Sequence, residues 1–184
     1  MIDIVVLPGI GGSGEGHWQT LWGQVHPRMR RFRPGSWDAP VLEDWMLALY
    51  RAVQAASDPP LLLAHSLACL LVAHWQHSSS ASVSGAFLVA VPDPASAVFP
   101  PEAAEFANPP QSRFRFPSLV VASCNDPYGT VQYARTQAAH WQSDLVEVGA
   151  LGHINAASGL ADWPQGRDLF GAFASRVAQR PDSS

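Results

Sequence analysis

Short, continuous apolar runs constrain the fold of this chain more than any other feature of its sequence. The clearest runs cover residues 2–7, 61–64, 86–91 and 119–123, with two weaker candidates at 29–33 and 145–148. Runs that are continuous rather than alternating are typical of strands covered on both faces of a sheet. Patterns with helical spacing fall between them, at residues 42–55, 67–75, 131–141 and 169–178. This alternation predicts an α/β fold in which about six parallel strands carry helices on both faces.

The length and composition of the chain fit that fold. The 184 residues suit a single domain, which we expect over residues 1–180, with residues 181–184 as a frayed tail. Little length is then left for a lid domain. Hydrophobic residues make up 47% of the chain and charged residues only 14%, which excludes disorder driven by charge.

Charge and cysteine content exclude several classes of function. All 11 basic residues are arginine, so no lysine is present to act as a base or form a Schiff base. The net charge of -4 argues against nonspecific binding of nucleic acid. The first residues lack the features of a signal peptide, and no apolar run approaches the length of a membrane span. The two cysteines lack metal spacing, so we expect no metal. A cytoplasmic protein with reduced thiols is the default, and we expect no cofactor and no membrane partner.

Ser66 stands where the apolar run 61–64 passes directly into a helical pattern. Ala64 and Ala68 flank it at minus two and plus two, where a sharp strand-to-helix turn requires small residues. Such a turn strains the backbone and lifts the hydroxyl clear of the sheet, as a nucleophile needs. His65 adjoins the serine, but its side chain should point away from the hydroxyl. The alternative is a serine that only caps the helix.

A serine nucleophile needs a base and an acid that orients the base. His153 follows the last strand candidate in a glycine-flanked loop, and Asp126 follows the run 119–123. The carboxyl ends of parallel strands lie along one edge of the sheet, so these residues should meet there. Asp93 follows the run 86–91 in the same way and is the alternative acid. The chain order serine, aspartate, histidine is that of the α/β-hydrolases.

The glycine-rich loop after the first strand, Leu7-Pro-Gly-Ile-Gly-Gly, allows backbone amides to approach a substrate closely. We expect the amide of Ile10, with Gly11 as the alternative, to bind a tetrahedral oxyanion. The second amide would come from Leu67, directly after the nucleophile.

The same loop has a second interpretation, because Gly9, Gly11 and Gly14 match the spacing of a dinucleotide-binding loop. Asp38 lies roughly where that motif needs an acid. Against it, no acid ends the second strand cleanly, and a lone match of this kind is weak evidence.

Residues 92–117 hold seven of the 16 prolines and leave the end of a predicted strand. A connection of this length suggests a function beside the site, with a rigid crossover as the plainer alternative. Phe99 from this segment and Trp18 from the first loop are the expected substrate-binding walls.

In these residues the chain resembles the retinoblastoma-binding-protein-9-like serine hydrolase family, in its bacterial branch. The resembling stretches are Leu7-Pro-Gly-Ile-Gly-Gly, His17-Trp18, Ala64-His-Ser-Leu-Ala-Cys69, Asn125-Asp-Pro-Tyr128, Gly152-His-Ile-Asn155 and Ser158-Gly-Leu-Ala-Asp-Trp-Pro164. The resemblance implies Ser66 as nucleophile, His153 as base and Asp126 as acid, on a compact, lidless sheet of about six parallel strands. The chain departs from the family at Ala68, where glycine is usual.

These observations support the hypothesis of a serine hydrolase that cleaves a small ester or related acyl bond through an acyl-enzyme. Its partner is then a small-molecule acyl substrate, and long lipids are not expected without a lid. The alternative is a catalytically feeble α/β-hydrolase-fold module that acts by binding a protein partner.

Overall fold

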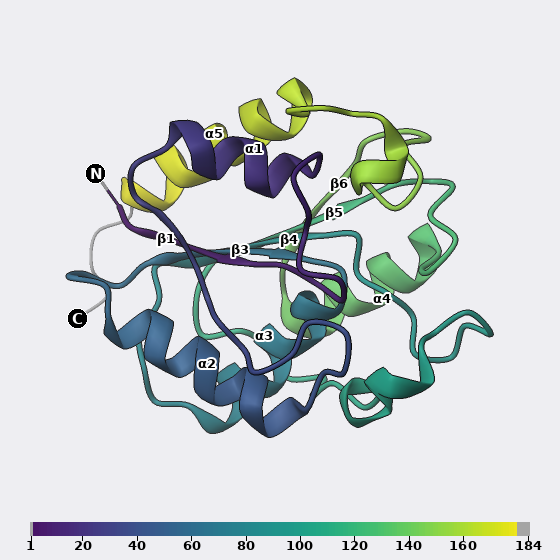
Figure 1. Ribbon diagram of the computed structural model, residues 1–184, viewed down its shortest axis with the longest axis horizontal. Helices are drawn as coiled ribbons and strands as arrows, with labels where there is room; N and C mark the ends of the chain where they lie inside the picture. The colour runs from purple at the N-terminus through teal and green to yellow at the C-terminus, as the bar shows by residue number, and fades with distance from the viewer. Residues whose placement is uncertain (1, 180–184) are drawn as a thin grey trace.

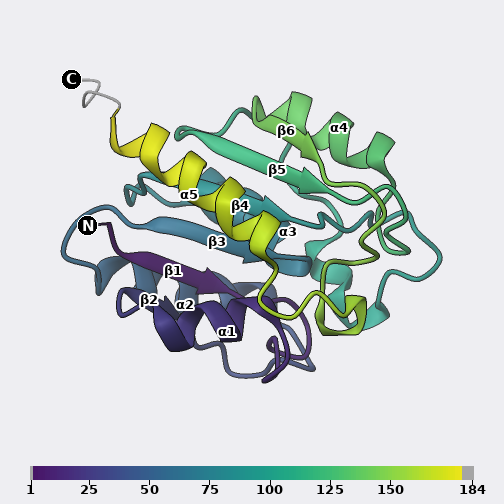
Figure 2. The same cartoon turned by 90° about the horizontal axis from the view of Figure 1, so that it is seen from above.

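The computed structural model describes residues 2–179, so the tail predicted at 181–184 lies outside the described residues. Six parallel strands form one sheet in the order β2-β1-β3-β4-β5-β6 (Figure 2). The strands are β1 (Ile4–Leu7), β2 (Met29–Arg31), β3 (Leu61–His65), β4 (Gly85–Val89), β5 (Ser118–Ala122) and β6 (Asp144–Glu147). Each lies within two residues of a predicted run, and the predicted α/β class is confirmed.

Five helices cover the sheet on both faces. The helices α1 (Trp18–Val25) and α5 (Pro164–Ala178) lie on one face, whereas α2 (Leu42–Gln54), α3 (Leu67–Ser78) and α4 (Val131–Trp141) lie on the other (Figure 1). Two short 3-10 helices, η1 (Pro101–Phe106) and η2 (Ala156–Ser158), occur in the connections after β4 and β6. The sequence pattern did not predict α1, and α5 begins five residues before its predicted start.

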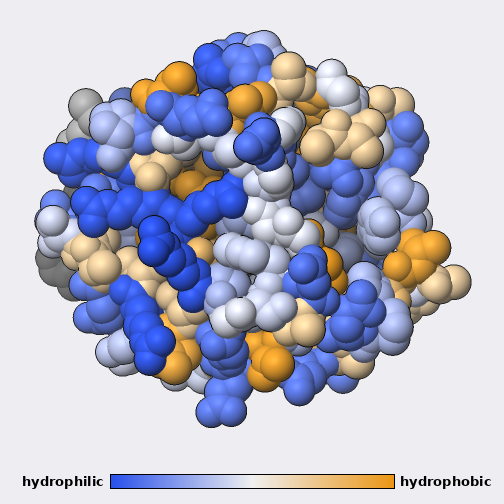
Figure 3. All heavy atoms as spheres, in the orientation of Figure 1, coloured by the Kyte–Doolittle hydropathy of each residue, from blue (hydrophilic) through white to orange (hydrophobic). Residues whose placement is uncertain are grey.

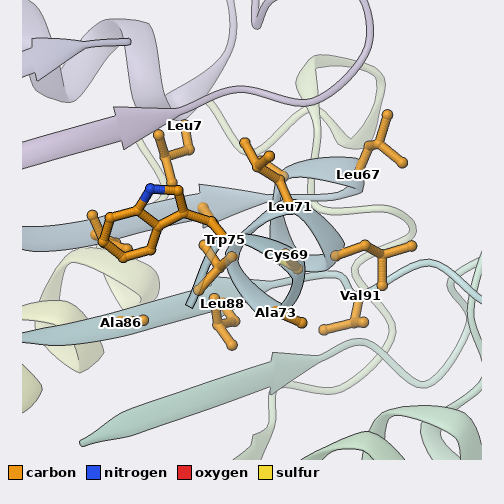
Figure 4. Packing of buried hydrophobic residues seen from close by; sticks show 14 of the residues in the cluster. Leu7, Leu67, Cys69, Leu71, Ala73, Trp75, Ala86, Leu88 and Val91 are labelled. Carbon is orange, nitrogen blue, oxygen red and sulfur yellow. The ribbon is translucent and has the colours of Figure 1, made fainter. Parts of the chain in front are cut away.

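The core consists of two apolar layers, one on each face of the sheet. The larger layer surrounds α3, of which nine of 12 residues are buried. Figure 4 shows Leu71 and Trp75 of α3 gathered with Leu7 of β1 and Leu88 of β4. The second layer contains Phe87 of β4 and aromatic side chains of α1 and α5. Both faces of the central strands are therefore covered, which explains why their sequences are continuously apolar.

The site lies where the strand order changes direction. From β1 the chain moves outward to β2, and it then crosses to β3 on the other side of β1. The loops that follow β1 and β3 consequently diverge at the carboxyl edge of the sheet, where α/β folds bind ligands.

The outer surface is more polar than these layers. Hydrophilic residues cover much of the face shown in Figure 3, and hydrophobic residues form small, separate groups there. None of the helices between residues 2 and 179 combines the length and apolar character that a membrane crossing demands.

Candidate active site

Ser66 occupies a sharp turn between β3 and α3. Its backbone angles, φ 56° and ψ -126°, lie outside the regions that a non-glycine residue normally adopts. Ala64 and Ala68 are fully buried on either side of this turn, and the Ser66 N–H donates to the carbonyl of Val89 (2.9 Å). The side chain of Ser66 makes no capping hydrogen bond, so helix capping does not account for its position.

The structure brings Ser66, His153 and Asp126 together. The Ser66 Oγ lies 2.8 Å from Nε2 of His153. The other ring nitrogen, Nδ1, lies 2.8 and 2.9 Å from the two carboxylate oxygens of Asp126. An ionised carboxylate only accepts hydrogen bonds, so Nδ1 carries the proton and Nε2 is free to accept from the serine hydroxyl. This is the arrangement that activates a serine nucleophile.

Asp93, the alternative acid, is engaged elsewhere. Its carboxylate accepts from the N–H of Ala95 (2.8 Å), two residues along, in a local turn. Its own N–H donates to the carbonyl of Tyr128 (2.8 Å). The Asp126 side chain is 2% exposed and directed at His153, so the geometry favours Asp126.

A pair of polar side chains at the end of β5 holds the histidine loop in place. The Ser123 Oγ accepts from the N–H of Leu151 (2.9 Å), and Asn125 Oδ1 accepts from the N–H of Gly152 (2.7 Å). Ser123 also donates to Asn125 (2.9 Å), which links the two supports. The loop that carries His153 is thereby attached to the strand that precedes Asp126.

The structure places Trp18 outside the cavity, contrary to the expectation that it lines the substrate site. Trp18 is 1% exposed, and its ring packs against Trp22 (centroids 4.7 Å apart) and Trp163 (5.3 Å). Its indole N–H donates to the carbonyl of Ile154 (2.8 Å). The physical reason is that Trp18 opens α1 on the side facing the sheet, so it supports the histidine loop from within the core.

The glycine-rich loop after β1 passes close to the serine turn. A Cβ atom on Gly9 would lie 3.0 Å from Ser66 Cβ and 3.1 Å from the carbonyl oxygen of His65. The N–H of Gly11 donates to the carbonyl of Trp37 (3.2 Å). Among residues 2–179, no acceptor is found for the N–H of Ile10. The geometry therefore favours Ile10 over Gly11 as the amide available to an oxyanion.

Two polar side chains, the buried Gln19 and the partly buried Arg31, fix this loop. Gln19 donates to the carbonyls of Leu7 (3.3 Å) and Leu63 (3.0 Å) and accepts from the Ser13 hydroxyl (2.7 Å). Arg31 donates to the carbonyls of Gly12 (2.7 Å) and Ser13 (2.6 Å). The loop that would bind the oxyanion is thus held to β1, β2 and β3 before any substrate arrives.

The dinucleotide interpretation of this loop receives no support from the geometry. The helix that follows begins at Trp18, so Gly14 lies before the helix and not within it. Asp38 is exposed in the connection between β2 and α2.

A cavity of about 430 Å³ opens above Ser66. Among the described residues, its lining contains no aspartate, glutamate, lysine or arginine. Its apolar side chains come from the glycine-rich loop, the start of α3, the proline-rich segment and η2: Ile10, Leu67, Pro92, Phe99, Pro100, Ala156 and Ala157. Phe99 thus lies in the wall, where the sequence placed it.

Two further histidines in the lining are neutral at pH 7. Burial, together with the nearby charges of Arg31 and His153, lowers the pKa of His17 from 6.5 to about 4. Burial also holds the pKa of His65 well below its usual value, and His153 and His17 add to this effect. The cavity consequently offers no fixed charge to a bound substrate.

The sequence assigned no role to two residues that lie beside His153. The ring of Tyr128 lies 4.5 Å from that of His153, centroid to centroid, and lines the cavity. In the sequence, the only indication that Tyr128 lies at the site was its position two residues after Asp126. The other is His65, whose ring lies 5.0 Å from that of His153. The residue before a nucleophile lies on the opposite face of the strand, which hid this contact.

A serine on a strand-to-helix turn, with a histidine and an aspartate at the carboxyl ends of the same parallel sheet, defines the class of α/β-hydrolases. Residues 4–172 match the model of the family described as serine hydrolase, and the chain belongs to that family. The resemblance to small serine hydrolases is confirmed.

Solved structures agree with this assignment. A protein described as a YdeN-like hydrolase from Pectobacterium atrosepticum is 30% identical, with a TM-score of 0.86 over 96% of this chain and 92% of that one. The ydeN gene product of B. subtilis is 22% identical, with a TM-score of 0.77 over 95% of this chain and 100% of that one. A thermophilic esterase from Thermogutta terrifontis shares the fold at 13% identity, with a TM-score of 0.68 over 96% and 90% of the two chains. A search of proteins with curated descriptions gave no match.

Proposed function

We propose that this serine hydrolase cleaves a small, neutral ester or related acyl bond through an acyl-enzyme. The observation that carries the proposal is the continuous series of contacts from Ser66 through His153 to Asp126, at 2.8 Å and at 2.8 and 2.9 Å. Such contacts let a neutral histidine remove the serine proton as the hydroxyl attacks a carbonyl.

The reaction would proceed in two halves. Ser66 attacks the carbonyl carbon while His153 takes its proton, and the amides of Ile10 and Leu67 stabilise the oxyanion. His153 then gives the proton to the leaving group, and Asp126 stabilises the imidazolium between these transfers. In the second half His153 activates water, which releases the acid and restores Ser66. Each oxyanion donor is expected to contribute about 3 kcal/mol of transition-state stabilisation.

The cavity supports a small, neutral acyl group. A volume of about 430 Å³ lies toward the lower end of ordinary ligand pockets, which span roughly 300–1,000 Å³. Burying a charged acyl chain beside side chains that carry no opposite charge would cost several kcal/mol. A neutral chain avoids this cost and gains from contact with apolar side chains such as Phe99.

Hydrolysis of matched p-nitrophenyl esters tests this proposal. One ester carries adipate with a free terminal carboxylate, and the other carries the methyl ester of the same acid, so the two differ in charge and by one methyl group. We expect kcat/KM for the neutral ester to exceed that of the charged ester by about 100-fold or more, from the cost of an unpaired buried charge. Equal rates would contradict the proposed selectivity, and no turnover of any ester would contradict the proposed reaction.

The rival proposal, a binding module with idle catalytic residues, predicts no turnover of such esters by the wild-type protein. It also leaves the preorganised contacts of Gln19 and Arg31 with the glycine-rich loop without a purpose.

The cytoplasm remains our expected location, because the cysteines of the described chain, Cys69 and Cys124, are both free thiols.

A further inference from the structure

His65, the residue before the nucleophile, contacts the base directly. Its side chain leaves β3 on the face opposite to Ser66 and is 4% exposed. Its Nε2 lies 2.9 Å from the backbone carbonyl oxygen of His153, 88 residues away in the sequence. Two consecutive residues therefore hold one histidine, Ser66 through the ring and His65 through the backbone.

The protonation state of His65 follows from this partner. A carbonyl oxygen only accepts hydrogen bonds, so the Nε2 of His65 must carry the proton. Burial in this apolar layer disfavours a second proton on the ring, which stays neutral. His65 is thus a permanent donor to His153.

The ring of His65 is itself fixed. His17 packs edge-on against it, with ring centroids 4.7 Å apart and planes at 71°. The Nδ1 of His17 accepts from the N–H of Gln19 (3.2 Å), which anchors that ring to the start of α1. The ring of His65 is therefore held between the end of β3 and the start of α1.

The segment that His65 holds needs such support. His153 lies between Gly152 and Ile154, whose φ values of 59° and 49° are both in the left-handed region. This conformation is strained for Ile154, because its side chain is β-branched. Backbone of this kind persists only where surrounding contacts determine it, and His65 makes one of those contacts at the base itself.

We propose that His65 is a positioning residue, whose Nε2–H fixes the backbone of His153 so that its imidazole stays within reach of Ser66. The proposal rests on the hydrolase reaction proposed above. Substitution of a histidine that is merely buried would change only the stability of the fold. Substitution of a positioning residue changes the rate of the chemical step even between variants of equal stability.

A matched pair of substitutions separates these two roles. His65→Gln retains an N–H donor at about the position of Nε2, whereas His65→Met has similar length and no donor. We expect kcat for His65→Met to fall about 30- to 100-fold with KM changed by less than about twofold, because misplacing a reacting group by about 1 Å has this effect. His65→Gln should keep kcat within about threefold of wild type.

A second measurement needs no turnover. The proton on Nδ1 of His153, which is donated to Asp126, is expected to give a downfield proton NMR signal in the free protein. We expect this signal to persist in His65→Gln and to broaden or disappear in His65→Met at matched thermal stability. Should His65→Met fail to fold, His65→Asn replaces it, since its amide is too short to reach the carbonyl. Equal kcat and an equal NMR signal in the donor and donor-free variants would overturn the proposal, whereas a wild-type protein without esterase activity would refute only the proposed function.

Discussion

Acidification should destabilise this fold through His17. In the folded chain the pKa of His17 is about 4, compared with 6.5 for the exposed side chain. As the pH falls below 6.5, His17 therefore becomes protonated in the unfolded chain while it remains neutral in the folded chain. The stability associated with a neutral His17 is complete above pH 6.5, declines through this range, and is lost below about pH 4.

The size of this effect follows from the shift. A difference of about 2.5 pKa units corresponds to about 3 kcal/mol once the pH is below both values. Between pH 7 and pH 5 the same linkage gives a loss of about 2 kcal/mol. His65 shifts in the same direction, so the wild-type protein should lose at least this much.

Urea unfolding followed by tryptophan fluorescence measures this loss. The matched control is His17→Asn, because an asparagine oxygen at about the place of Nδ1 can still cap α1 through the N–H of Gln19. With a slope of about 2 kcal/mol/M, the midpoint of the wild type should fall about 1 M further than that of the control between pH 7 and pH 5. Other titrating groups are common to both proteins and cancel in this comparison. Parallel midpoints for the two proteins across this range would refute the burial of a neutral His17.

Three further predictions, two of them with a matched control substitution, test the site. Gly9→Ala should lower kcat/KM about tenfold or more, because the added Cβ crowds the turn at Ser66, whereas Gly16→Ala, with open space around it and outside the cavity lining, should leave activity unchanged. Asp126→Asn should reduce kcat about 10³- to 10⁴-fold and Asp93→Asn should not; the reverse pattern would assign the acid to the other loop. Trp18→Phe removes the donor to the carbonyl after the base, so calorimetry should show about 1–3 kcal/mol less stability, and an unchanged melting temperature would contradict that contact.

The strands were predictable because their burial leaves a direct mark on the sequence. A strand covered on both faces must be apolar at nearly each position, as 61–64 and 119–122 are. The helix α1 left no such mark. It has only eight residues, too few for a helical repeat to stand out, and it begins at a histidine cap where serine, threonine, aspartate or asparagine is usual.

The grouping of Ser66, Asp126 and His153 was predictable for a similar reason, since parallel strands bring their carboxyl ends to one edge. The surroundings of these residues were not. Whether Trp18 faces the cavity or the core depends on how a two-turn helix is rotated against the sheet, which is decided by tertiary packing. The bond from His65 to His153 spans 88 residues and ends on a backbone atom, so no side-chain pattern reports it.

The central claim is that Ser66 is a nucleophile activated by His153, and covalent labelling tests it most directly. A fluorophosphonate probe reacts with activated serines, and peptide mass spectrometry locates the adduct. We expect one adduct on Ser66 in the wild type, none in Ser66→Ala, and strongly slowed labelling in His153→Ala. Labelling that persists in Ser66→Ala, or a wild-type protein that the probe does not modify, would contradict this account.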